Sequence, residues 1–294
     1  MTSKKTILVT GATGSIGGAA ALALVKGGAK VILLGRKLDK LKARAQRIHT
    51  ELSEADINFS NNDIETLVID FADMDSVRNA ASEAMNRFAQ INGLVLSVGV
   101  LIQNGPNILP NGHEAMFATN VMGPFLFTQL LKKRFEESKG LVLHVINPYS
   151  KKMNWDDIES VKKHRSMTAF DRTKTCNRIF AGELSRRYEG KISSVAFNPS
   201  YVIDKSDPDL KDRWPKGFAG FIWKIMTILV ARSPSVAGEP IADLMLSSQD
   251  NNAINGTLFK LYKRVEKPDK AMNNKVLGKR FWDELVKLTE LTMQ

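Results

Sequence analysis

The chain has 294 residues, of which 43% are hydrophobic, and its formal net charge is +11. Since no linker-like segment or fixed-period repeat divides it, we expect a single domain over residues 1–294. The lone cysteine, Cys176, excludes an internal disulfide, and the scattered basic residues, which match no recognition motif, argue against nucleic acid as a partner.

The amino-terminal residues and the longest apolar run bear on location. Residues 1–5 lead directly into a strand without a signal-type apolar stretch, which predicts a cytoplasmic protein. The apolar run at residues 218–230 is too short for a transmembrane segment and contains Lys224. We therefore expect an amphipathic lid helix there, within a lid or substrate segment at about residues 201–235. Peripheral membrane contact is the alternative interpretation of this run.

The first predicted strand, residues 6–10, leads through a glycine turn into an alanine-rich helix that begins near Ile16. Gly11 suits a tight turn, Gly14 would let the backbone approach a pyrophosphate, and Gly17 would let the helix pack closely on the strand. Glycine turns also serve as plain connections, but the position between a strand and a helix favours a dinucleotide site at the helix N-terminus. The predicted contacts in this turn are Thr10, Gly11, Thr13, Gly14, Ser15, Ile16 and Gly17.

The second predicted strand, residues 29–35, is a continuous apolar run and ends at Arg36 and Lys37. An acidic residue at this point binds the ribose 2′-hydroxyl of NAD(H), whereas an arginine accommodates the 2′-phosphate of NADP(H). Arg36, followed by Lys37, therefore favours NADP(H) as the cofactor. The alternative is that Arg36 merely begins the charged helix predicted at residues 39–54.

Strands and helices continue to alternate along the rest of the chain. Asp73 or Asp75 would cap the helix that follows the third strand. The alternation predicts an α/β fold with a doubly wound, Rossmann-like parallel sheet and ligands at the carboxyl ends of its strands. The remaining predicted strands are residues 64–69, 93–97, 140–146, 191–197 and 256–262, and the remaining helices are 76–90, 113–137, 166–188 and 279–291.

These motifs together resemble the short-chain dehydrogenase/reductase family, and in particular its retinol-dehydrogenase-like branch. The resemblance covers nearly the whole chain and implies an NADP(H)-dependent oxidoreductase that forms a homodimer or homotetramer through the helices at 113–137 and 166–188. The glycine turn departs slightly, because the usual middle glycine falls at Ser15 and the glycine stands at Gly14. The matching segments are the glycine turn, Arg36 and residues 70–77, 117–123, 170–188, 232–235 and 256–259.

The resemblance also implies roles for individual residues. Asp70 would meet the adenine ring, Asn120 would hold a water in the proton path, and Lys174 would bind the nicotinamide ribose. The alternatives are a polar residue at a helix kink for Asn120 and a solvated lysine for Lys174. Further implied cofactor contacts are Phe71, Ser97, Gly99, Pro199 and Val202.

The catalytic positions depart from the family pattern, which is Tyr-x-x-x-Lys. Phe170 stands four residues before Lys174, and a phenyl ring cannot donate or accept a proton. The family's serine falls at Asn147 or at its neighbour Ile146, and Asn147 can donate a hydrogen bond but is not a hydroxyl relay.

Three side chains are candidate substitutes for the missing acid: Tyr201, Tyr149 and His164, each with the alternative of a loop residue without a role. Cys176 is expected in the packed core, and no metal site is predicted. Three functions remain open. The favoured one is an NADP(H)-dependent oxidoreductase acting on a hydrophobic small molecule, such as an iminium or an activated double bond, in an apolar pocket formed by Phe170, Leu96 and the lid. The alternatives are a catalytically inactive NADP-binding sensor or scaffold and a non-redox enzyme on the same fold.

Overall fold

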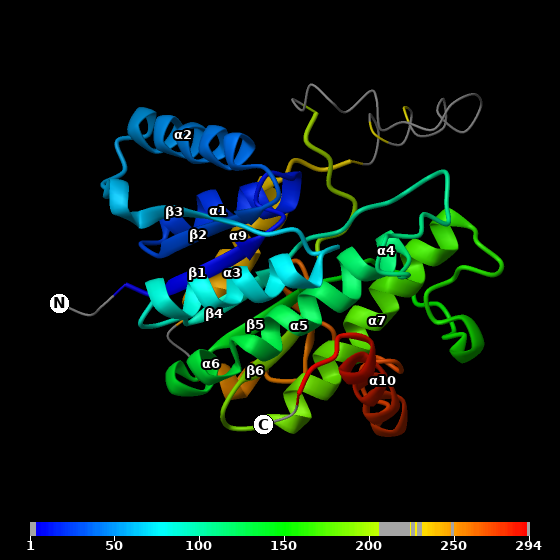
Figure 1. The fold of residues 1–294 in the computed structure, drawn as a ribbon. Coiled ribbons are helices and arrows are strands. Elements are labelled where there is room, and N and C mark those ends of the chain that lie inside the picture. The colour runs from blue at the N-terminus through cyan, green and yellow to red at the C-terminus, as the bar shows by residue number, and fades with distance from the viewer. Residues whose placement is uncertain (1–3, 206–223, 225–226, 228–230, 248–249, 293–294) are drawn as a thin grey trace.

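The computed structural model describes residues 4–205, 224, 227, 231–247 and 250–292. Its centre is an eight-stranded sheet in the order β3-β2-β1-β4-β5-β6-β7-β8, parallel except for β8 (Figure 1). This confirms the predicted doubly wound α/β fold. The strands are β1 (Thr6–Thr10), β2 (Lys30–Gly35), β3 (Ile64–Val68), β4 (Gly93–Leu96), β5 (Leu141–Val145), β6 (Ser193–Asn198), β7 (Leu258–Lys260) and β8 (Lys263–Arg264).

The chain reverses its direction of winding at β1, which pairs with β2 on one side and with β4 on the other. Ile7 in β1 faces Val31 in β2 and Gly93 in β4. In open α/β sheets, ligands bind outside the carboxyl ends of the strands at such a point. The glycine turn that follows β1 lies at this position.

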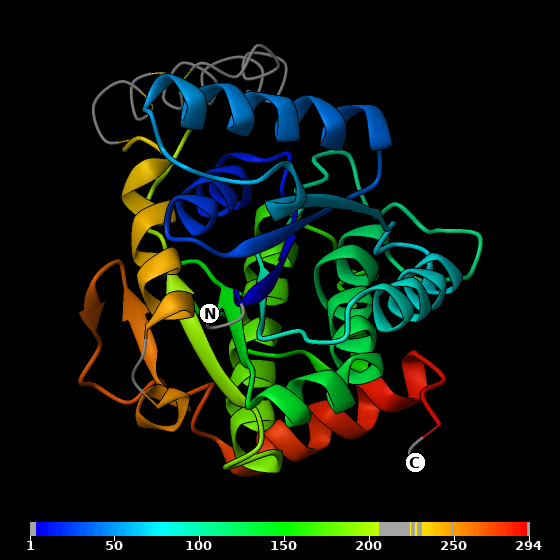
Figure 2. The same ribbon diagram turned by 90° about the vertical axis from the view of Figure 1, so that its left-hand side faces the viewer.

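Helices cover both faces of the sheet (Figure 2). Alternating strand residues enter two separate cores, so that Leu8 packs in one and Ile7 and Val9 pack in the other. One layer contains α1 (Ser15–Lys26), α2 (Leu38–Glu54) and α9 (Ser235–Leu246). The opposite layer contains α3 (Met74–Arg87), α5 (Gly123–Leu130), α7 (Ser166–Arg187) and α10 (Lys275–Leu288), with α6 (Lys132–Ser138) after α5.

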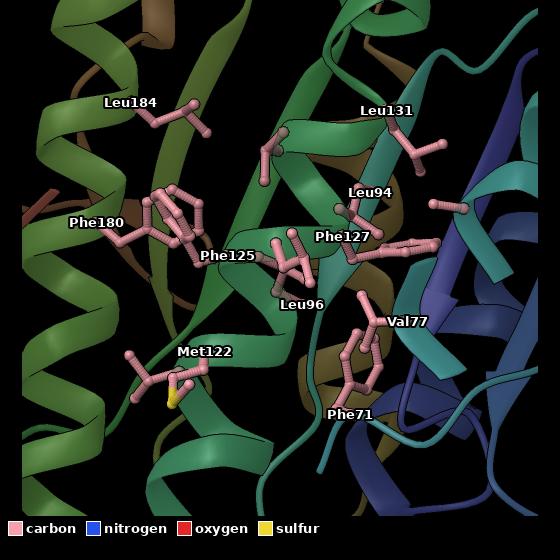
Figure 3. Close-up of a cluster of buried hydrophobic side chains, with 14 of the residues drawn as sticks. Phe71, Val77, Leu94, Leu96, Met122, Phe125, Phe127, Leu131, Phe180 and Leu184 are labelled. Carbon is pink, nitrogen blue, oxygen red and sulfur yellow. The ribbon is translucent and has the colours of Figure 1, made fainter. Parts of the chain in front are cut away.

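The core that contains Leu8, between the sheet and the layer with α3, α5, α7 and α10, is rich in aromatic rings (Figure 3). Phe125 of α5 and Phe180 of α7 lie 5.3 Å apart between their ring centroids, and Phe71 meets Phe127 edge to face at 5.8 Å. Trp282 of α10 completes this cluster, 5.0 Å from Phe125. The carboxyl-terminal helix thus packs on α5 and α7, the region expected to form an oligomer interface; oligomerisation stays a prediction.

The prediction of one continuous helix at residues 113–137 is wrong, because the structure divides this segment. It begins at Ala115 as the short α4 (Ala115–Phe117), widens into a π-helical turn at Ala118–Met122, and continues as α5 and α6. Pro124 explains the wide turn, because it lacks an N–H and its ring would clash with the carbonyl of Asn120 in a regular α-helix.

Several other boundaries also differ from the predictions. α3 begins at Met74 with Asp73 as its cap, which accepts a hydrogen bond from the backbone N–H of Asp75 at 3.0 Å. α10 begins at Lys275, earlier than expected, because Asn274 caps it. α9 was not predicted, since its sequence contains Gly238 and Pro240; close packing on α1 stabilises it.

The predicted lid helix at residues 218–230 lies outside the described residues, apart from Lys224 and Thr227. Within the described ranges, no helix is both long and apolar enough to cross a bilayer.

Candidate active site

The glycine turn forms a tight cradle at the carboxyl end of β1. Gly11 has a φ of +61°, a conformation that favours glycine, and a Cβ there would lie 3.1 Å from the Cα of Val98. A Cβ on Gly17 would lie 2.6 Å from Oγ of Ser97 and closer still to the carbonyl of Gly11. No side chain caps α1 at Gly14, so the first-turn N–H groups of Ser15, Ile16 and Gly17 are available to an anion.

Two hydroxyls hold this cradle to the neighbouring strand. Oγ1 of Thr10 donates to the carbonyl of Val95 at 3.1 Å and accepts from the backbone N–H of Ser97 at 3.0 Å and of Val98 at 3.1 Å. Oγ of Ser97 in turn donates to the carbonyl of Thr10. Both hydroxyls are thus used in bonds between β1 and the end of β4. A cofactor would therefore contact Thr10 and Ser97 through their backbone groups.

Positive charge surrounds the cradle on the β2 side. Arg36 and Lys37 are exposed where β2 ends. Arg44, which the sequence did not single out, donates from Nη2 to the carbonyl of Thr13 at 3.2 Å. Its guanidinium lies over Gly18, where a Cβ would be 2.7 Å from Cζ.

Of the two predicted contacts that follow β3, Asp70 forms hydrogen bonds within its own turn, whereas Phe71 packs in the core. The Asp70 carboxylate accepts from the backbone N–H of Ala72 at 3.0 Å, and its own N–H donates to Oγ of Ser76 at 3.0 Å. Phe71 is 3% exposed and turns its ring into the core against Phe127 (Figure 3), while its carbonyl packs against Gly123; its contact to a cofactor stays a prediction.

Asn120 lies in the π-helical turn and is fully buried. Its Oδ1 accepts from the N–H of Val100 at 2.8 Å, while its Nδ2 donates to the carbonyl of Val100 at 3.0 Å and to Oγ1 of Thr173 at 3.2 Å. The side chain therefore ties the loop after β4 to α7. Its role in holding a water stays a prediction.

Lys174 is buried between the carboxyl ends of β4 and β5. Its Nζ lies 3.5 Å from the carbonyl of Val98 and 3.4 Å from that of Val145. The Phe170 ring centroid is 5.6 Å from Nζ of Lys174. A Cβ on the exposed Gly99 would be 2.9 Å from the same Nζ. Burial lowers the pKa of Lys174 to about 8. The structure thus brings Lys174, Phe170 and Gly99 together.

Asn147, after β5, is held from two sides. Its Nδ2 donates to Oδ1 of Asp171 at 2.6 Å, and its carbonyl accepts from the Arg178 guanidinium. Arg178 is also ion-paired with Asp269, which fastens the segment before α10 to this site. Oδ1 of Asn147 is buried, and no described residue donates to it. Sequence reasoning missed Asp171, Arg178 and Asp269, because a buried charged residue resembles a solvated one until its partner is known.

The candidate substitute acids lie in three settings. Tyr149 has 65% of its surface exposed. His164 is engaged in its own loop, with Nδ1 3.0 Å from the carbonyl of Ser160. Tyr201 is partly buried beyond β6, and its carbonyl accepts from the N–H of Arg232 at 3.0 Å. None of the three is brought into a described contact with Lys174.

The loop beyond β6 contains two of the predicted cofactor contacts. Pro199 is buried and Val202, which is partly buried, forms a parallel bridge with Arg232. Cys176 is fully buried as predicted, with Sγ 3.8 Å from Sδ of Met153, and burial raises its thiol pKa. Leu96 also lies in the core, 4% exposed; the apolar pocket that it was expected to form with Phe170 and the lid stays a prediction. The described residues contain no group of three or more metal-ligating side chains.

Residues 5–155 match the family model of the short chain dehydrogenases. The chain belongs to the short chain dehydrogenase family. It is thereby an NAD(P)-dependent oxidoreductase by family, as predicted. The match ends before α7, so Phe170 and Lys174 lie beyond the matched residues.

Curated relatives agree with this family and with its retinol-dehydrogenase-like branch. A short-chain dehydrogenase/reductase of Armillaria gallica is 27% identical over 292 residues, covering 96% of this chain and 89% of the relative. Retinol dehydrogenase 13 of Mus musculus is 26% identical over 295 residues, covering 98% of this chain and 85% of the relative.

Solved dehydrogenase structures share the fold of the chain. L-sorbose reductase of Gluconobacter frateurii, complexed with NADPH and L-sorbose, superimposes with a TM-score of 0.67 at 16% identity, covering 90% of this chain and 98% of that one. Actinorhodin polyketide ketoreductase with NADPH gives a TM-score of 0.66 at 17% identity, covering 88% of this chain and 95% of that one.

Proposed function

We propose that the protein is an NADP(H)-dependent oxidoreductase that acts on a hydrophobic small molecule whose reduction needs no tyrosine as proton donor. The observation that carries the cofactor choice is the exposed pair Arg36 and Lys37 at the end of β2, beside the glycine cradle. A guanidinium there suits the 2′-phosphate of NADP(H). The free 2′-hydroxyl of NAD(H) is instead bound by a carboxylate, and this position has none. Related structures solved with NADPH support the same choice.

The residues of the chain fit such a cofactor along the whole sheet edge. The uncapped N-terminus of α1 would bind the pyrophosphate, because its N–H groups and dipole favour an anion. Asp70, which follows β3, would meet the adenine ring, and Lys174, which lies between β4 and β5, would bind the nicotinamide ribose. When bound, the cofactor supplies a hydride.

The chemistry follows from what Phe170 lacks. Its ring is 5.6 Å from the Lys174 Nζ and offers no proton to a substrate oxygen. An iminium needs only a hydride, since it already carries its charge, and an activated double bond can take its proton from water. Two apolar side chains are exposed on neighbouring segments of the chain: Ile108, 48% exposed before α4, and Met167, 52% exposed in the first turn of α7. These features support a hydrophobic substrate of that kind.

A cofactor-binding protein without turnover is the second candidate. The Asn147 amide supports it, because this side chain donates to Asp171 at 2.6 Å and so is already engaged within the protein. In that case NADPH would bind but would not be oxidised with any class of substrate.

Cofactor choice is tested by fluorescence titration of the purified protein with NADPH and with NADH. Arg36→Ala should weaken NADPH binding at least about tenfold, or about 1.4 kcal/mol, and NADH binding far less. Lys42→Ala, which removes an exposed lysine of α2, the helix that begins two residues after Arg36, is the control. Failure of the wild-type protein to bind either nucleotide would overturn the proposal.

Substrate class is tested by NADPH oxidation with three hydrophobic probes: a cyclic iminium, an enone and a ketone. The wild-type protein should reduce the iminium or the enone and leave the ketone. Phe170→Tyr should gain ketone reduction, because it places a phenol beside Lys174. Ketone reduction by the wild-type protein at the rate of the other probes would refute the role of Phe170, and NADPH binding without any turnover would favour the second candidate.

A further inference from the structure

The side-chain amide of Asn147 is held at its nitrogen end only. Its Nδ2 donates to Oδ1 of Asp171 at 2.6 Å, and an ionised carboxylate accepts hydrogen bonds but does not donate them. The amide is therefore fixed in this orientation, because a flipped amide would turn its oxygen towards the carboxylate. Oδ1 of Asn147 lies on the side away from Asp171, buried and without a donor among the described residues.

The backbone of Asn147 is fixed as well. Its carbonyl accepts a hydrogen bond from the guanidinium of the buried Arg178, which is ion-paired with Asp269. The residue as a whole is partly exposed, and the exposed Pro148 follows it at the carboxyl end of β5. A rigid amide thus stands at the sheet edge where ligands bind in this class of fold, with its oxygen unpaired.

This amide lies beside the pair Phe170 and Lys174. Asp171, which holds the amide, directly follows Phe170 in α7. The carbonyl of Val145, two residues before Asn147, lies 3.4 Å from Nζ of Lys174. Since the proposed function assigns the nicotinamide ribose to Lys174, the amide of Asn147 would lie on the side of the site where the substrate reacts.

We propose that Asn147 is a specificity-determining residue whose Oδ1 accepts a hydrogen bond from an N–H at the reacting centre, so that the preferred substrate is a protonated imine. This rests on the proposed function and narrows its substrate class. An acceptor selects a donor: a protonated imine carries an N–H next to the carbon that takes up the hydride, a ketone offers only lone pairs, and an N-alkyl iminium offers no donor there.

The bond between Asn147 and Asp171 makes this oxygen a strong acceptor. Donation from Nδ2 to a carboxylate polarises the amide, because hydrogen bonds in series strengthen one another. An acceptor buried without a donor is costly, and a charged donor forms the stronger hydrogen bond. A cationic N–H is therefore the group that this oxygen favours most.

The reaction balances without a proton donor. The imine carbon takes up the hydride with its electron pair, the π pair of the C=N bond becomes a lone pair on nitrogen, and NADPH is oxidised to NADP⁺. The N–H stays on the nitrogen of the amine product. Because the positive charge leaves the nitrogen during this step, the hydrogen bond to Asn147 should act on binding of the cation rather than on kcat.

Two probes of one ring system separate this hydrogen bond from the effect of charge. Dihydroisoquinoline at a pH below its pKa is a cation with an N–H, and N-methyldihydroisoquinolinium is the same cation with a methyl group in that place. Calorimetric titration into the complex with NADP⁺ measures binding alone, since NADP⁺ has no hydride to give. The wild-type protein should bind the N–H cation at least about tenfold more tightly, and kcat/KM with NADPH should show the same preference.

Variants at two positions test whether Asn147 causes this preference. Asn147→Leu keeps the size of the side chain and removes both polar atoms, so the preference should fall to about twofold or less. The double variant Asn147→Asp/Asp171→Asn is the matched control, because the amide at position 171 can donate to the carboxylate at position 147, whose other oxygen then accepts. It keeps the composition and the charge, and its preference should stay at about tenfold or more. Asp171→Asn alone frees the amide to bind in either orientation and should lower the preference without abolishing it.

Equal affinity of the wild-type protein for the two cations would overturn the proposal. A preference that persists in Asn147→Leu would overturn it as well, because it would then come from the bulk of the methyl group. A thermal melt checks that each variant is folded; should Asn147→Leu fail to fold, Asp171→Asn and the double variant carry the comparison.

Failure of the proposed function gives a different result. In that case the wild-type protein does not bind NADPH, or binds it and oxidises it with neither the cations nor an enone. Reduction of the enone together with equal binding of the two cations would leave the proposed function standing and overturn the role of Asn147.

Discussion

His144 makes the folding stability of this protein depend on pH in a predictable direction. It lies near the carboxyl end of β5, buried, with its ring edge-on to Phe180 at 4.9 Å and its Nε2 3.1 Å from Oγ of Ser194. Burial lowers its pKa from 6.5 to about 3. Between these two pKa values the unfolded chain binds a proton at this residue that the folded chain does not. The free energy of unfolding must therefore fall as the pH falls below 6.5.

The size of the effect follows from linkage. Between pH 6.0 and pH 5.0 the unfolded histidine becomes almost fully protonated while the folded one stays neutral, which costs about 1.2 kcal/mol of stability. This range lies above the titration of most carboxyl groups, so His144 dominates the difference between a variant and the wild-type protein.

The test compares urea unfolding of the wild-type protein and of His144→Gln at pH 6.0, 5.5 and 5.0. Glutamine keeps a polar group near Ser194 but does not titrate. The wild-type protein should lose about 1.2 kcal/mol more than the variant across this range, whatever the variant's stability at pH 6.0. Equal losses in the two proteins would refute a neutral, buried His144.

Two further substitutions test the packing around the site. Trp282→Ala should lower the free energy of unfolding by about 3–5 kcal/mol, because it removes a buried ring between α5 and α7, whereas Lys279→Ala on the exposed side of α10 should change it little; urea unfolding measures both. Arg178→Met should cost about 3–5 kcal/mol, since it leaves Asp269 without its cation, and adding Asp269→Asn should recover part of that loss; additivity of the two changes would contradict a direct ion pair.

The sequence predicted well those features whose cause is local. The strand, glycine turn and helix at residues 6–26 are set by adjacent residues, and the structure confirms the close packing at Gly11 and Gly17. The alternation of apolar strands with helices likewise predicted the parallel sheet, since each strand shows its burial in its own composition.

Features that depend on distant partners could not be predicted. The π-helical turn at Ala118–Met122 is a partial exception, because Pro124 marks an irregularity there, but a proline alone does not show which kind of turn forms. α9 was missed because Pro240 lowers its helix propensity, and only packing on α1 reveals it. Arg44 and Arg178 resemble solvated helix residues in the sequence; their partners Thr13 and Asp269 lie 31 and 91 residues away.

The glycine turn and the region around Phe170 tolerate substitution to different extents, and this difference decides which activities need to be tested. On the nucleotide side the shape comes from backbone: a Cβ at Gly17 would strike Ser97 and Gly11, so a change there disturbs the fold itself. On the side of the chemistry, Phe170 and tyrosine differ by one hydroxyl at a partly exposed position, so the phenol can be absent at little cost to folding. An intact cradle is therefore no evidence for carbonyl reduction. Nucleotide binding and turnover therefore have to be measured separately, and the proposed substrate, one that needs only a hydride, is the first to test for turnover.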